Sequence, residues 1–264
     1  MSATKAAATN SLQSASLSTG KVDRVTKLIQ DIRGQKDVTA MVHEVEAIGP
    51  PAVSALTQLL RDGTKIERSN AMYLLGRVNV YPAEAVPVIE NMLDEKGADR
   101  VHIAIDLLRI NPDSDKAMNV LVNEMKRGDT PTRIIIARML SLNPNASKHV
   151  DVLIDMMSDK ESDVRSAVAE TLGEIGLKDK TAGAVMVPAL IMALDDSSPW
   201  VRCQSARALG LIGAPAISAI PVLQRKTEDK SDRVKNAATV ALALINSAVK
   251  QKPSSNKVQK KIRK

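Results

Sequence analysis

Hydrophobic residues recur every three or four positions in the stretch 159–176, DKESDVRSAVAETLGEIG. This spacing predicts a half-buried helix that turns one apolar stripe toward the interior. The stripe consists of Val164, Ala167, Val168, Leu172 and Ile175. Ala169 and Gly173 lie beside it, and their small size lets a neighbouring backbone come close. We expect the chain to enter this helix from a short acidic turn at Asp159. Arg165 follows that acid by six residues.

The same frame recurs along most of the chain. Its basic residue falls at Arg68, Arg100, Arg133, Arg165, Arg202 and Lys235, with separations of 32, 33, 32, 37 and 33 residues. Each copy also carries another helical stripe ahead of this one. A period of this length with two helices per copy is typical of a solenoid. The one longer separation predicts a loop insertion near residues 177–182.

The pattern therefore predicts an all-α fold, an α-solenoid of about seven stacked helix pairs. The first pair lacks the acid and the arginine, as an end cap of the stack would. We expect the paired helices at 22–32 and 38–48, 52–60 and 67–78, 83–93 and 99–110, 117–125 and 132–142, 149–157 and 164–175, 182–194 and 201–212, and 216–225 and 234–246.

With its spacing of acid and arginine, its small residues inside second helices and its Leu-Gly-x-Ile-Gly endings, the chain resembles the HEAT repeat proteins. It is most similar to the short bacterial-type repeats related to phycobilisome lyases, over residues 22–246. The resemblance implies a ladder that links neighbouring repeats, in which Asp62, Asp94, Asp159, Asp196 and Asp229 are structural partners of Arg68, Arg100, Arg165, Arg202 and Lys235. The alternative is a phosphate-binding row of arginines, and the matched acids favour the structural interpretation.

The composition agrees with a helical core built from aliphatic side chains. Of the 264 residues, 44% are hydrophobic and 25% are charged, but the chain has no Phe and only one Trp. No apolar run approaches the roughly 18 residues that cross a bilayer, and the polar N-terminus has no hydrophobic signal core. Because Cys203 is the only cysteine, we expect a reducing compartment and a cytoplasmic location.

The charge is concentrated at the C-terminus. The chain has a net charge of +7, and residues 250–264 contain seven basic residues and no acid. We therefore divide the chain into a disordered arm, 1–20, the solenoid, 21–249, and a disordered basic tail, 250–264. Such a tail suits contact with nucleic acid, an anionic membrane or an acidic protein, or it only adds solubility. The predicted tail contacts are Lys257, Lys260, Lys261, Arg263 and Lys264.

No catalytic, metal-binding or cofactor-binding constellation emerges from the sequence, which favours a non-enzymatic protein. HEAT-type deoxyhypusine hydroxylases bind two irons through several His-Glu pairs, whereas this chain has one, His43-Glu44. It has no phosphate-binding loop, no Cys-x-x-Cys and no nucleophile elbow. We expect His102 to be packed on the apolar stripe of its helix, and Cys203 to be a buried side chain.

The second helices are the best candidates for a binding surface, because in HEAT solenoids they line the concave face. Two positions per repeat should point into this groove, one four residues after the other. The resulting partner-binding residues are Tyr73, Arg77, Ile105, Arg109, Arg138, Leu142, Glu170, Glu174, Arg207 and Leu211, with Val240 and Leu244 continuing the rows. A lining of mixed apolar and charged residues fits a protein or peptide, and the alternative is an ordinary solvated helix face.

We therefore expect a non-enzymatic scaffold that binds a protein partner on its concave face, with the tail as an auxiliary electrostatic contact. Two alternatives stay open. One is a subunit of a chromophore lyase or isomerase, as the phycobilisome lyase resemblance implies. The other is a nucleic-acid-associated protein that uses the tail with Arg77, Arg109, Arg138 and Arg207. Trp200 either anchors a partner or covers the seam between repeats, and we favour the seam.

Overall fold

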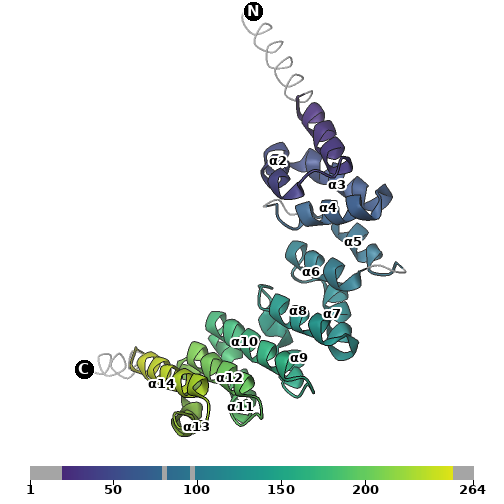
Figure 1. Ribbon diagram of the computed structural model, residues 1–264. Coiled ribbons are helices and arrows are strands. Elements are labelled where there is room, and N and C mark those ends of the chain that lie inside the picture. The colour runs from purple at the N-terminus through teal and green to yellow at the C-terminus, as the bar shows by residue number, and fades with distance from the viewer. Residues whose placement is uncertain (1–19, 79–81, 96–98, 252–264) are drawn as a thin grey trace, which may run out of the picture. The chain divides into compact units, whose positions relative to one another are not determined.

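The computed structural model describes residues 20–78, 82–95 and 99–251. All regular secondary structure in these residues is helical, which confirms the predicted all-α fold (Figure 1). The chain divides into two compact units, residues 1–121 and residues 122–264, hereafter unit 1 and unit 2. In the described part, none of the helices is both long enough and apolar enough to cross a membrane.

The described part of unit 1 starts with a helix over residues 20–33. Thr64 accepts from the amide of Glu67 while the Glu67 carboxylate accepts from the amide of Thr64, a capping box that starts α4. The elements that follow residues 20–33 are η1 (Val38–Met41), α2 (Val42–Ile48), α3 (Pro50–Asp62), α4 (Lys65–Leu75), α5 (Val86–Met92) and α6 (Arg100–Ile110), and α7 (Asp115–Arg127) crosses the unit boundary.

Unit 2 contains a series of second helices packed side by side. Helix α10 packs on α8 and α12, and α12 packs on α14, while the first helices α9, α11 and α13 cover the other side of these helices (Figure 1). The seven predicted helix pairs are present in the described residues. The elements are α8 (Thr130–Leu140), η2 (Ala146–His149), α9 (Val150–Met156), α10 (Ser162–Lys178), α11 (Lys180–Ala193), α12 (Pro199–Ile212), η3 (Ala214–Ala219), α13 (Ile220–Lys226) and α14 (Asp232–Gln251).

The predicted loop insertion at residues 177–182 is wrong. Helix α10 continues to Lys178, and only Asp179 separates it from α11. The Asp179 carboxylate caps α11 by accepting from the amides of Thr181 and Ala182 at 2.9 and 3.1 Å. The extra residues thus lengthen a helix, because one capping acid is enough to turn the chain.

The lysines on either side of Asp179 tie this junction to its neighbours. Lys178 Nζ donates to the carbonyl oxygen of Ser141, after α8, at 2.8 Å. Lys180 Nζ donates to the carbonyl oxygen of Leu211, in the last turn of α12, at 2.7 Å. Both ammonium groups therefore satisfy carbonyl groups at helix C-termini, where positive charge is favourable.

An arginine ladder links consecutive repeats in unit 2. Arg165 Nε and Nη2 donate to the two carboxylate oxygens of Asp196, in the next repeat, at 2.7 and 2.8 Å. Arg202 makes the same bidentate contact with Asp229 at 2.9 and 2.8 Å. Arg133 contacts Asp159 at 2.9 and 3.1 Å. These side chains are nearly buried, and the bidentate geometry is the strong form of the contact.

The ladder differs from the predicted one in its partners. The carboxylate of each aspartate binds the arginine of the preceding repeat. The arginine of the aspartate's own repeat contacts only the main-chain carbonyl oxygen of that aspartate. Arg165 Nη1, for example, donates to the carbonyl oxygen of Asp159 at 2.8 Å. Lys235 pairs instead with Asp232 at 2.8 Å, one turn before it on the same helix. Sequence spacing could not decide between the aspartate of the same repeat and the aspartate of the next repeat, because both lie at nearly constant distances along the chain from the arginine.

The predicted pairs of unit 1 are not formed. Arg68 binds Glu95 at 2.6 Å rather than Asp62, and Asp94 binds Lys116 at 2.6 Å rather than Arg100. These contacts are more exposed than those of unit 2, so their contribution to stability is small.

We predict that the ladder makes stability depend on acid pH. Hydrogen bonds from Arg202, opposed by burial, hold the pKa of Asp229 below its ordinary value. Because the folded pKa lies below the unfolded value of about 3.9, this carboxylate contributes stability above that pH and loses it as the pH falls through the folded pKa. Urea unfolding should show a smaller loss of stability below about pH 4 for Asp229→Asn than for the wild type. The exposed-site variant Glu174→Gln should retain the wild-type profile, and an unchanged profile for Asp229→Asn would refute the prediction.

Candidate functional site

The residues predicted to bind a partner in unit 2 lie on or directly after its second helices, and we call this set the second-helix face. It consists of Arg138, Leu142, Glu170, Glu174, Arg207, Leu211, Val240 and Leu244. Three of its apolar side chains are well exposed, Leu142 at 60%, Val240 at 57% and Leu244 at 45%. Arg138 Nε lies 3.9 Å from Glu170 Oε2, an ion pair between adjacent helices. The residues predicted for one face of unit 2 lie on the neighbouring helices α8, α10, α12 and α14, except Leu142, which follows the end of α8.

A hollow of about 560 Å³ lies at one end of the second-helix face. Leu211, Ile212, Leu244 and Ala248 supply apolar surface, with Gly213, Ala214 and Pro215 beside them, and Lys180, Thr181, Ser247 and Gln251 supply polar groups. Burial lowers the pKa of Lys180. Sequence reasoning placed Leu211 and Leu244 on the face but missed the hollow, because α11 and η3 complete it only through tertiary packing.

The predicted residues of unit 1 form a smaller cluster. The Arg77 guanidinium lies 3.6 Å above the centroid of the Tyr73 ring, and Arg109 Nη1 lies 2.7 Å from Asp106 Oδ1. Burial raises the pKa of Asp106, against the opposing charges of Arg109 and Arg77. Ile105, predicted to face a partner, is only 8% exposed and belongs to the core, so we correct that assignment.

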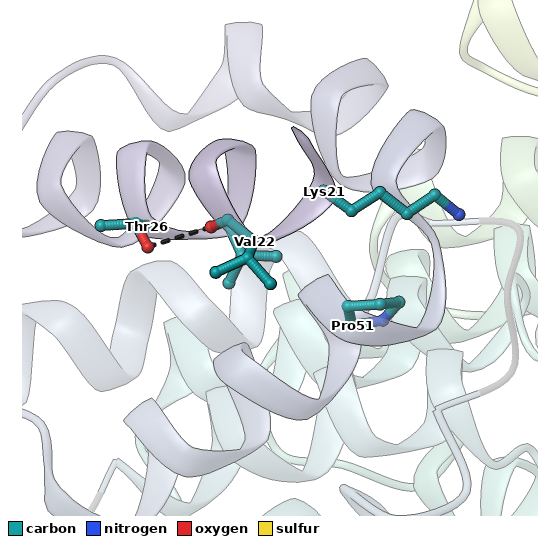
Figure 2. Close-up of a pocket in the computed structure, with 5 residues that line it drawn as sticks. Lys21, Val22, Thr26 and Pro51 are labelled. Atoms are coloured by element: carbon teal, nitrogen blue, oxygen red, sulfur yellow. Dashed lines mark hydrogen bonds between the residues drawn. The ribbon is translucent and has the colours of Figure 1, made fainter. Parts of the chain in front are cut away.

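An apolar pocket of about 330 Å³ lies between the first described helix and the start of α3. Figure 2 shows Val22, Thr26 and Pro51 around it, with the side chain of Lys21 extending along its edge. The Thr26 hydroxyl donates to the carbonyl oxygen of Val22 at 3.0 Å, so it is already engaged. Among the described residues, the lining is therefore mainly aliphatic, and Lys21 and Thr26 are its polar side chains.

Neither cysteine nor histidine forms a reactive centre in the described residues. Cys203 is buried as predicted, and burial raises the pKa of its thiol, which disfavours the nucleophilic thiolate. His102 is exposed and contacts Asp99 at 2.8 Å, so its predicted packing on the apolar stripe is wrong. Three or more potential metal ligands do not gather anywhere in the part of the chain that the structure describes.

Trp200 contacts the next repeat at the seam and is 54% exposed. The guanidinium of Arg233, on α14, lies 3.5 Å above the centroid of the Trp200 ring, on α12. Beside them, Cys203 Sγ lies 3.8 Å from the carbonyl oxygen of Arg233. The indole thus fixes adjacent helices through a cation–π contact. The predicted tail contacts, Lys257, Lys260, Lys261, Arg263 and Lys264, lie outside the described residues.

Comparisons with known proteins agree with the repeat architecture. A sequence profile described as HEAT repeats matches residues 118–187 and 187–253, which together are 136 of the 264 residues. No curated protein sequence matches the chain. An engineered protein from the Northeast Structural Genomics Consortium has 20% identity over 83% of this chain and 68% of that chain, with a TM-score of 0.50.

Two further solved structures have lower TM-scores. The complex of CpcE and CpcF of phycocyanin lyase from Nostoc sp. PCC7120 is 26% identical over 74% of this chain and 65% of that chain, with a TM-score of 0.39. A designed armadillo repeat protein in complex with the peptide (KR)4 is 14% identical over 86% of this chain and 98% of that chain, with a TM-score of 0.47. On the evidence of its repeating helix pairs and of a profile that spans more than half of its length, this chain belongs to the HEAT repeat family.

Proposed function

We propose that this protein is a non-enzymatic, cytoplasmic scaffold that binds a protein or peptide segment on the second-helix face of unit 2. The observation that carries the proposal is the hollow of about 560 Å³ between α12 and α14, where Leu211 and Leu244 meet. An apolar recess at the end of a mixed surface is the usual place for an anchor side chain of a partner.

The apolar lining sets the kind of anchor. Leu244 is 45% exposed and Leu211 is half-buried, so an aliphatic partner side chain would remove further apolar surface from water. Burying such a side chain contributes roughly 1.5–3 kcal/mol. The Lys180 ammonium, Thr181 hydroxyl and Gln251 amide at the edge offer hydrogen bonds that would orient the partner backbone.

The charges along the rest of the face favour protein over nucleic acid. Arg207 and Arg138 are accompanied by Glu170 and Glu174, so the face offers both signs of charge. A nucleic-acid groove is mostly basic and supplies stacking aromatics, whereas this chain has one Trp and two Tyr. In the proposal, Tyr73, Arg77 and Arg109 serve as a contact on unit 1, and the tail lysines serve as an auxiliary contact for an acidic partner.

To test the proposal, peptides that bind the full chain are selected from a random library displayed on phage. Their affinities are then measured by calorimetry. Leu244→Ser should weaken binding of the selected peptides about tenfold, which corresponds to about 1.4 kcal/mol. Val185→Ser is the matched control, because Val185 is 57% exposed but lies on the first helix α11. Unchanged binding by Leu244→Ser, with binding lost in Val185→Ser, would show that the second-helix face is not the site.

A further inference from the structure

A second concave surface of unit 2 lies on the side of the first helices. It is a groove of about 620 Å³ between α9 and α11. Its apolar lining includes Ile154 from α9, Met157 directly after α9 and Met192 from α11. Methionine side chains are flexible and polarisable, so such a lining can adapt to an aliphatic partner. This groove takes no part in the second-helix face.

An exposed apolar stripe runs along α11 into this groove. It consists of Ala184, Val185, Pro188 and Met192, which lie on one side of the helix at intervals of three or four residues. Met192 is 72% exposed and Val185 is 57% exposed. The stripe begins one turn after Thr181, which lines the hollow at the other end of α11. It therefore joins the two concave regions along one helix.

Acidic side chains border the groove at its α9 side. Asp155 lines it, and Asp151 lies one turn earlier on the same side of α9. Both residues are exposed, and neither carboxylate has a side-chain partner among the described residues. The other acids nearby are already engaged, because Asp196 binds Arg165 and Asp195 binds Lys226 at 2.8 Å. The groove thus combines an apolar floor with two unneutralised carboxylates.

The chain itself contains a segment with the complementary chemistry. Residues 252–264, outside the described part, carry six basic residues and no acid. Their aliphatic residues are Val258 and Ile262, four positions apart and separated by Gln259, Lys260 and Lys261. After Lys252 the segment has an uncharged stretch, Pro253 to Asn256, and its other five basic residues lie between Lys257 and Lys264. Aliphatic and basic residues therefore alternate in the part that would reach the acids.

The segment starts close enough to reach the groove. Gln251, the last residue of α14, lines the hollow together with Lys180 and Thr181 at the start of α11. From Thr181 to Met192, α11 rises about 17 Å, at about 1.5 Å per residue. The seven residues from 252 to 258 span up to about 24 Å when extended. The apolar residues of the segment can thus reach the far end of the stripe on the same chain.

We propose that residues 252–264 dock on their own chain along α11, with Val258 and Ile262 on the groove near Met192 and the flanking lysines beside Asp151 and Asp155. Docking covers the exposed apolar stripe and neutralises the two free carboxylates. It also holds the basic residues on the first-helix side, so that an acidic partner must displace them before it can use them. The composition of the tail alone predicts a solvated segment. The apolar floor and the two carboxylates of the groove are the reason to expect a docked segment instead.

Disulfide trapping in the full chain tests the contact. Cys203→Ser removes the native thiol, and Met192→Cys with Ile262→Cys places one thiol on the groove and one on the tail. We expect the intramolecular disulfide to form about tenfold faster than in the control pair Val240→Cys with Ile262→Cys, because docking raises the local concentration at Met192. Val240 is a fair control, since it is 57% exposed but lies on the second-helix face. Adding Asp151→Asn and Asp155→Asn should slow the Met192 pair about fivefold.

Equal trapping at Val240 and Met192, or a disulfide that forms only between separate chains, would overturn the proposal. A second measurement uses the native cysteine, in case Cys203→Ser alters the fold. Peroxide should oxidise Met192 about threefold faster when Lys257, Lys260 and Lys261 are all changed to Gln, while Met139 on α8 keeps its rate. Equal rates of Met192 oxidation in the wild type and in the triple Lys→Gln variant would also exclude docking. Peptide binding by Leu244→Ser is unaffected by either result, so this proposal and the proposed function fail separately.

Discussion

Arg165→Ala is expected to lower the free energy of unfolding by about 3 kcal/mol. The guanidinium and the Asp196 carboxylate are 13% and 12% exposed, and removing the arginine leaves the carboxylate without its bidentate partner. The variant also frees the carbonyl oxygen of Asp159, which Arg165 Nη1 satisfies at 2.8 Å. Urea unfolding at neutral pH measures the effect.

Lys235→Ala provides the matched control for this prediction. Lys235 has the same position in its repeat, but its partner Asp232 is 89% exposed and lies on the same helix. An exposed pair of this kind contributes at most about 1 kcal/mol. A double-mutant cycle with Arg165→Met and Asp196→Asn should show a smaller loss than the sum of the single changes. Equal losses for Arg165→Ala and Lys235→Ala would mean that the contact between repeats is not what stabilises the stack.

Gly173→Leu is expected to destabilise the protein by about 2 kcal/mol. A Cβ atom on Gly173 would lie 2.8 Å from Ala208 Cα and 2.9 Å from Ala208 Cβ, on the next second helix. Separating the two helices to fit a larger side chain costs about 3 kcal/mol, and better helix propensity returns about 1 kcal/mol. Thermal unfolding of the variant should therefore start at a lower temperature than in the wild type.

Ala243→Leu is the control, because residue 243 has the position in the last repeat that Gly173 has in α10. Ala243 is exposed, so the new side chain meets solvent. We expect the change to stay within about 0.5 kcal/mol of the wild type. The same comparison explains the glycine in the repeat motif, since a Cβ atom on Gly210 would lie 3.0 Å from Ala241 Cα on the next second helix. If Gly173→Leu were as stable as Ala243→Leu, close helix packing would not account for the motif.

The repeat period predicted the helices well, because each helix buries one stripe and such stripes are visible in one segment at a time. The positions of Leu211 and Leu244 on one face follow from the same local periodicity. The loop predicted near residues 177–182 failed for a local reason that the period does not contain. A capping aspartate, Asp179, turns the chain between two helices without any loop.

The sequence by itself determined the all-α repeat architecture, the buried apolar stripe of most helices and the small residues where helices approach closely. These features depend on the order of residues along one helix. Only the tertiary structure decided which acid each arginine binds, that Ile105 is buried, that Lys180 joins Leu211 and Leu244 around a hollow, and that α9 and α11 enclose a groove beside two free carboxylates. These features depend on distances between helices, and distances between separate segments are set by packing rather than by spacing along the chain.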